Sequence, residues 1–144
     1  MLRIINGVAA GVTLLALIVM LLPTWERVWV EDDETLVMDV VWHEPSLIFS
    51  FNVFPAITLI AVGLALIALL VAVIRDEIVM FSLSALWSAT VAPIVGHLIF
   101  DGLGGWALAA PILTGIAALT LSFGLWYFDR KDAASDALTR AVGS

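Results

Sequence analysis

Four long stretches without a charged side chain occupy most of this 144-residue chain. A helix needs about 20 consecutive apolar residues to cross the roughly 30 Å hydrocarbon core of a bilayer. We therefore expect four membrane-spanning helices, over residues 4–22, 52–74, 78–100 and 106–128. None of these ranges contains Lys, Arg, Asp or Glu. The pattern predicts an all-α membrane protein, a single domain built as a four-helix antiparallel bundle.

The composition favours lipid over water as the surroundings of these helices. Apolar residues make up 62% of the chain and its mean hydropathy is +1.11, above the ~45–50% apolar content of typical soluble domains. Cysteine is absent, which excludes disulfides, thiolate metal sites and iron–sulfur clusters. No basic patch is present to neutralise phosphates, so a nucleic-acid partner is not expected.

The basic residues predict how the chain is oriented. Cytoplasmic loops of membrane proteins carry an excess of Lys and Arg. One orientation places five of the six basic residues inside and only Arg27 outside. The five are Arg3, Arg75, Arg130, Lys131 and Arg140. We therefore expect a multi-pass protein of the cell membrane with both termini in the cytoplasm, an external segment over residues 23–51 and a cytoplasmic tail over residues 129–144.

The external segment has the pattern of a small β-hairpin. Residues 35–42 alternate so that Leu36, Met38, Val40 and Trp42 would share one face. Residues 26–30 are rich in β-formers, and a polar reversal over residues 31–34 separates the two runs, without the Asn-Gly or Asp-Gly pair of a tight turn. An isolated hairpin is marginal in water. We expect helix ends or a partner protein to cover its apolar face.

Aromatic and acidic residues of this segment are candidates for partner docking. The docking residues would be Trp25, Trp29, Trp42, Glu31, Asp32, Asp33 and Glu34. Tryptophan also suits the membrane–water boundary, so the three rings could instead be interfacial anchors and hairpin core.

The same segment resembles the start of the first extracellular segment in the claudin/PMP22-like four-helix family. The resemblance rests on Pro23-x-Trp25 at the end of the first span, followed by strand, turn, strand and Trp42. It implies a small adhesion or accessory scaffold with both termini inside. The Gly-Leu-Trp motif of that family is missing around Trp42, and so are its two cysteines.

Two histidines provide candidate ion or metal ligands. His97 and Asp101 lie four residues apart and would share a helix face near the external end of the third span. His43 and Glu44 precede the second span at the same predicted depth. Such groups could bind a metal or a haem iron, or take part in proton transfer. A neutral histidine hydrogen-bonded to Asp101 is the alternative.

Prolines and glycines of the spans leave two further questions open. Pro55, Pro93 and Pro111 fall in the external halves of three spans; they could open a vestibule near Asn52 and His97, or mark kinks near helix starts. Small residues allow close helix packing, either within one chain or between chains. The candidate packing glycines are Gly7, Gly11, Gly63 and Gly115.

No catalytic triad, P-loop, dinucleotide fingerprint or zinc-protease motif occurs. We therefore expect a non-enzymatic protein without a cofactor, acting through contacts as an accessory subunit or a claudin-like envelope scaffold. It would have the lipid bilayer and a membrane protein or a second copy as partners. The alternatives are a subunit of an oligomeric channel or transporter that uses His97 and Asp101, and a haem- or metal-binding subunit. The net charge of −7 with a single lysine suggests a halophilic source.

Overall fold

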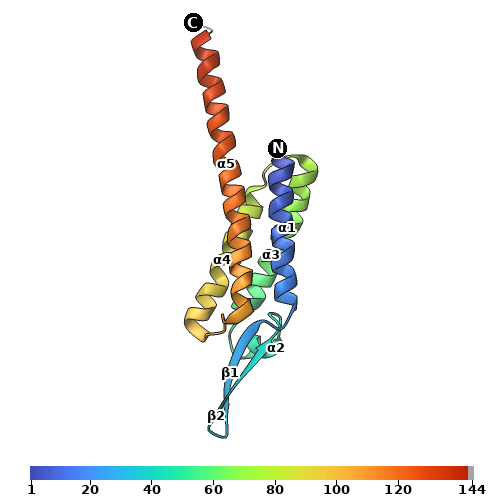
Figure 1. Cartoon of the computed structure of the whole chain (residues 1–144), viewed down its shortest axis with the longest axis vertical. Helices are drawn as coiled ribbons and strands as arrows, with labels where there is room; N and C mark the ends of the chain where they lie inside the picture. Colours follow the sequence, from blue (N-terminus) through green and yellow to red (C-terminus); the bar gives the residue numbers. More distant parts are fainter. Residues whose placement is uncertain (143–144) are drawn as a thin grey trace.

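Four long helices lie side by side and form the body of the molecule (Figure 1). Each is long and apolar enough to cross a membrane, by length and composition. In this computed structural model, which describes residues 1–142, they are α1 (Leu2–Leu21), α3 (Phe54–Arg75), α4 (Met80–Phe100) and α5 (Ala109–Val142). The prediction of four long apolar helices is confirmed.

The helices pack as an up-and-down bundle in which each has two main neighbours. Helix α1 contacts α3 and α5, and α4 contacts the same two helices. The link between α3 and α4 is short, and Asp76 ends α3 in a left-handed conformation. Consecutive helices therefore run antiparallel, as the short predicted loops required.

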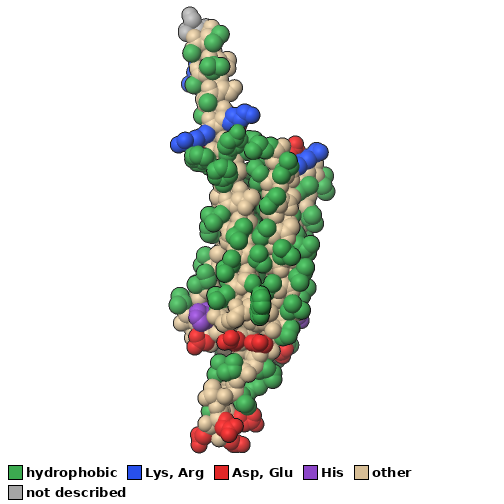
Figure 2. Space-filling model, viewed as in Figure 1, with side chains coloured by type: hydrophobic (Ala, Val, Ile, Leu, Met, Phe, Trp, Pro, Cys, Tyr) green, Lys and Arg blue, Asp and Glu red, His purple; other side chains and the backbone are tan. Residues whose placement is uncertain are grey.

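Small side chains fill the interior of the bundle, and large ones cover its outside. Ala9, Ala65 and Ala117 are fully buried, whereas Ile60 and Ile67 are largely exposed. Figure 2 shows hydrophobic side chains over the flanks of the bundle. Water would favour the opposite arrangement, and small residues at helix contacts are typical of packing in lipid.

The start of the second long helix differs from the prediction that it begins at Asn52. A separate five-residue helix, α2 (Pro45–Phe49), comes first. Residues 50–53 are not helical, and Phe51 has a positive φ of 63°. Helix α3 then begins at Phe54, followed directly by Pro55, whose missing N–H costs nothing in a first turn.

The last helix is longer than the predicted span of residues 106–128. A short 3-10 turn, η1 (Gly105–Leu108), leads into α5, which continues to Val142 without a break. Residues 129–142 of the predicted tail are helical and exposed; residues 143 and 144 lie outside the described part of the chain.

The three span prolines do not occupy equivalent positions. Pro55 lies in the first turn of α3 and Pro111 is the third residue of α5. Only Pro93 lies inside a helix, where it leaves the carbonyl of Ala89 without its usual N–H donor. Two of the three prolines therefore mark helix starts, which was one of the two expectations for them.

An antiparallel hairpin projects beyond one end of the bundle, called here the hairpin end (Figure 1). Its strands are β1 (Trp25–Glu31) and β2 (Glu34–Val40), paired from Trp25↔Val40 to Glu31↔Glu34. The predicted hairpin is confirmed, although β2 ends two residues before Trp42.

The two strands are joined by a two-residue turn of Asp32 and Asp33. Both have positive φ, 49° and 65°, as in the type I′ turn that matches the twist of a hairpin. Asp adopts this conformation more readily than most residues but less readily than Gly. The tight turn was not predicted, because neither Asn-Gly nor Asp-Gly is present.

Of the four predicted packing glycines, the structure places only one in contact with another helix. A Cβ on Gly115 would lie 3.5 Å from the Thr90 side chain, whereas nothing would lie within 4 Å of a Cβ on Gly7, Gly11 or Gly63. These three glycines therefore face away from the described chain. Packing within one chain is not their role in this structure.

The turn yields a first test. Asp33→Gly should stabilise the hairpin by about 0.7 kcal/mol, because glycine adopts positive φ at no steric cost. Amide exchange over residues 25–40 should then slow by about threefold, measured by mass spectrometry in detergent. Asp39→Gly makes the same chemical change inside β2 and should speed exchange there. Equal effects at both positions would contradict the assigned turn.

The outward glycines yield a second test. Joint replacement of Gly7 and Gly11 by Ala should raise helix stability, by up to about 1 kcal/mol per site, because neither Cβ meets another group. Thermal unfolding in mild detergent measures this effect. Gly96→Ala is the matched control and should lower stability, because its Cβ would lie 2.6 Å from the Phe54 Cβ. If the Gly7 and Gly11 variant instead loses stability and no longer forms oligomers, these two glycines pack between copies of the chain.

Candidate functional site

Two buried tryptophans fasten the base of the hairpin to the bundle. The rings of Trp25 and Trp42 meet edge to face, with centroids 5.0 Å apart and an interplanar angle of 74°. The indole Nε1–H of Trp42 donates to Thr24 Oγ1 at 2.8 Å, and that hydroxyl donates to the Val19 carbonyl at 3.0 Å. Thr24 thus links Trp42 to the last turn of α1, where the Val19 carbonyl also accepts the Leu22 N–H at 3.2 Å.

A second attachment joins the hairpin to the loop after α4. The Glu26 N–H donates to the Gly102 carbonyl at 3.0 Å. Gly102 has a φ of 127° and lies against the Trp25 ring, where a Cβ would overlap the indole. The hairpin is therefore held from two sides, by α1 through Trp42 and by the loop before η1 through Trp25.

This arrangement corrects the predicted docking surface. Trp25 and Trp42 are 1% and 0% exposed, so they form the hairpin core, which was the alternative expectation for them. Trp29 alone of the three reaches the surface, and the Arg27 guanidinium lies 4.9 Å from its ring centroid. Sequence alternation could not separate these rings, because Trp25 and Trp29 lie on the same strand face.

The distal half of the hairpin is uncovered on both faces. Every residue of β2 before Val40 is exposed, and so are Val28 and Val30 of β1. We expected helix ends or a partner to cover the face formed by Leu36, Met38, Val40 and Trp42. Within the described chain, only Val40 and Trp42 of this face are covered. Leu36 and Met38, which pair with Trp29 and Arg27 across the hairpin, are still 42% and 49% exposed. An apolar, two-faced strand pair therefore stands free of the bundle.

Charge is divided unequally between the two ends of the molecule (Figure 2). The hairpin end, residues 23–51 and 101–105, carries eight acidic side chains and one basic one, a difference of −7. The opposite end carries five acidic and five basic side chains, which cancel. The whole formal charge of the chain therefore lies at the hairpin end, where Glu31, Asp32, Asp33 and Glu34 form the tip.

His97 contacts Asp101 as predicted, and it also accepts a hydrogen bond from the loop that follows α4. Its Nδ1 lies 3.5 Å from Asp101 Oδ1 and accepts a hydrogen bond from the Leu103 N–H at 3.2 Å. An accepting Nδ1 corresponds to the neutral ring with its proton on Nε2, as assigned from this bond. His97 thereby helps to shape the loop that holds Trp25.

The structure does not assemble the predicted metal cluster. His43 is exposed, and within residues 1–142 no hydrogen bond or ion pair joins it to His97 or Asp101. Among the described residues, no group of three His, Asp or Glu side chains is placed to hold a metal ion. Residues 1–142 therefore offer the metal alternative no site of three such ligands.

Buried threonine hydroxyls of the bundle bond mainly to their own helices. Thr13, Thr58 and Thr114 are fully buried. Each donates to a carbonyl four residues earlier in its own helix, at 2.7, 2.7 and 3.1 Å. Such bonds satisfy the hydroxyl locally. Thr114 also accepts a hydrogen bond from the Thr90 hydroxyl at 3.0 Å, which joins α4 to α5.

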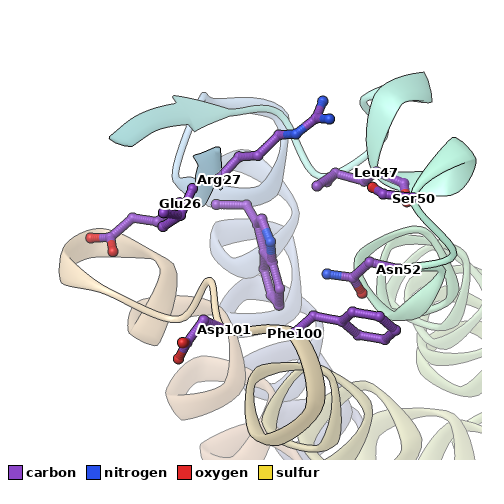
Figure 3. A pocket seen from close by; sticks show the side chains of 9 residues that line it. Glu26, Arg27, Leu47, Ser50, Asn52, Phe100 and Asp101 are labelled. Carbon is purple, nitrogen blue, oxygen red and sulfur yellow. The ribbon is translucent and has the colours of Figure 1, made fainter. Parts of the chain in front are cut away.

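A cavity of about 220 Å³ opens at the base of the hairpin (Figure 3). It lies between β1, the link from α2 to α3, and the end of α4, and Asn52 points into it. The other lining residues are Trp25, Glu26, Arg27, Val28, Leu47, Ser50, Phe100 and Asp101. The cavity could not be predicted from the sequence, although Asn52 was a candidate, because its walls come from three distant segments.

Comparison with known proteins adds no relative. No family model matches the chain, and no curated protein or solved structure matches it either. The resemblance to the claudin/PMP22-like family, carried by Pro23, Trp25 and Trp42, therefore stays a prediction.

The attachment at Gly102 can be tested directly. Gly102→Ala should destabilise the protein by about 2–3 kcal/mol, because the added methyl overlaps the Trp25 ring and the backbone φ disfavours Ala. Near-ultraviolet circular dichroism during thermal unfolding reports on the packed indoles. Gly105→Ala is the control: it also has positive φ but open space around it, and should cost only about 1 kcal/mol. Equal losses would show that backbone strain, and not the indole contact, decides the effect.

Proposed function

We propose that this chain is an integral protein of the cell membrane, with four spans and both termini in the cytoplasm. Support comes from four long apolar helices and from large side chains on the outside of the bundle. The orientation is supported by charge: five of six basic residues lie at the end opposite the hairpin, which the positive-inside rule assigns to the cytoplasm. The hairpin end then faces outward.

In this proposal the protein acts through contacts, as an accessory subunit or a claudin-like envelope scaffold, and not as an enzyme. The observation that carries it is the distal hairpin, held firmly at its base but uncovered on both faces. Two strands alone are marginally stable in water, and exposed strand edges readily pair with another chain. A partner that packs on this hairpin would stabilise it and bury its apolar side chains.

The docking surface in this proposal is the distal hairpin, not the tryptophan pair. Its apolar part consists of Val28, Trp29, Val30, Leu36, Val37 and Met38. Its charged part is the acidic tip, residues 31–34. Such a combination suits a partner with apolar side chains bordered by Lys or Arg, because complementary charge speeds encounter and selects against acidic surfaces.

Charge neutralisation tests this function. Glu31→Gln, Asp32→Asn and Asp33→Asn together remove three charges from the tip while keeping side chains that tolerate the turn. A partner that copurifies in mild detergent should be retained about tenfold less well and with weaker salt dependence. Quantitative mass spectrometry of the copurified protein measures the loss.

The chain offers a matched control at its other end. Asp129→Asn, Asp132→Asn and Asp136→Asn also remove three negative charges, but from the exposed part of α5. This variant should retain the partner. Equal loss of the partner in both variants would show that net charge alone causes the effect. Full retention of the partner in both variants would show that the acidic tip takes no part in the interaction.

A further inference from the structure

The free edge of β1 is the part of the hairpin that its own chain leaves without a partner strand. The two-residue turn makes Glu31 and Glu34 a pair that exchanges backbone hydrogen bonds. Along an antiparallel ladder, such pairs alternate with pairs whose N–H and C=O groups point away from the partner strand. Counted from the turn, the outward-pointing residues of β1 are Glu26, Val28 and Val30. Those of β2 are Thr35, Val37 and Asp39.

The bond of Glu26 to the loop after α4 agrees with this count. Its N–H donates to the Gly102 carbonyl at 3.0 Å, on the side of β1 away from β2. The loop thus makes the first contact that a third strand would make, and it then leaves the edge to form η1. Among residues 1–142, no group outside the hairpin forms a hydrogen bond with Val28 or Val30. The chain therefore occupies the base of this edge and leaves its outer part open.

This outer part of the edge lacks three features that commonly protect strand edges, which are proline, lysine and a β-bulge. Residues 25–40 contain neither proline nor lysine, and the strands pair one to one along their whole length. Val28 and Val30 are 51% and 71% exposed. The edge of β2, in contrast, carries the carboxylate of Asp39, a charge that disfavours pairing. The β1 edge is therefore the one more open to a further strand.

A second copy of this chain does not fit this edge. Two copies in one membrane are related by an axis along the membrane normal, which keeps every group at its own height. Each outward N–H would then face the same N–H of the other copy, with no acceptor. Copies in opposed membranes would bring together two hairpin ends that each carry eight acidic side chains and one basic one, and like charges repel. The occupant should therefore be a different chain that carries basic side chains.

We propose that the β1 edge binds an extended segment of another protein, which adds a third strand beside Val28 and Val30 and places Lys or Arg against the acidic tip, residues 31–34. In strand addition, main-chain hydrogen bonds give affinity and alternate side chains give specificity. On one face the added strand meets Val28 and Val30, and on the other face it meets Trp29. The third strand depends on the docking function proposed above and specifies its occupant and its edge.

The test uses a defined probe, the fluorescent peptide Lys-Lys-Thr-Val-Thr-Val-Thr, on the purified protein in mild detergent. Fluorescence anisotropy gives its dissociation constant, and the same peptide with Glu-Glu in place of Lys-Lys should bind at least about tenfold more weakly. Amide exchange in the wild-type chain, with isotopically labelled valine, is then followed by nuclear magnetic resonance. Saturating peptide should slow exchange of Val28 and Val30 about tenfold or more, but not that of Val37 on the other edge.

Proline variants test the same edge from the side of the protein. Val28→Pro removes the outward N–H but keeps the ladder to β2, because proline is tolerated in edge strands where the N–H faces solvent. It should weaken binding of the Lys-Lys peptide about tenfold. Val37→Pro is the matched control, since Val37 pairs with Val28 and its N–H points from the opposite edge. This variant should bind the peptide like the wild-type chain.

Four results would overturn the third strand. They are no binding of the Lys-Lys peptide at millimolar concentration, equal binding of the two peptides, slowed exchange at Val37 in place of Val28 and Val30, and equal weakening by the two proline variants. Self-association of the protein that Val28→Pro abolishes would assign the edge to a second copy instead. If Val28→Pro keeps a copurified partner that the neutralised tip loses, the docking function stands and strand addition at β1 fails.

Discussion

The edge-to-face contact of Trp25 with Trp42 joins the two parts of this molecule. Trp42 donates to Thr24, whose hydroxyl bonds to the last turn of α1, and Trp25 packs against Gly102 in the loop after α4. A two-stranded hairpin without such support is marginal. The contact also positions β1 as a wall of the cavity beside Asn52. Both the exposed strands and the polar cavity therefore depend on one pair of buried rings.

The helices and the hairpin were predictable because each follows from a strong local pattern. Bilayer thickness sets the length of an uncharged helix, and the four charge-free ranges match α1, α3, α4 and α5 to within a few residues, apart from the continuation of α5. The alternation over residues 35–42 predicted β2. The contact of His97 with Asp101 also followed from their spacing on one helix face.

What the sequence could not predict depends on contacts between distant segments. Trp25 and Trp29 have the same residue type and strand face, and only tertiary packing buries one and exposes the other. The glycine spacing of Gly7 and Gly11 suggested close packing, but which face of α1 meets a neighbour is set by the whole bundle. The break before Phe54 needs the positive φ of Phe51, an apolar residue that carries no turn signal.

The continuation of α5 beyond the bundle has a consequence for how that helix melts. Starting a helix is the costly step, whereas extending an existing one adds a hydrogen bond per residue. The packed part of α5 supplies the start, so residues 129–142 stay helical although all are exposed. Without packing to make the transition abrupt, this segment should shorten gradually from its end on warming, long before the bundle loosens. The length of the projecting rod is thus set by temperature and solvent, like that of a peptide attached to a fixed template.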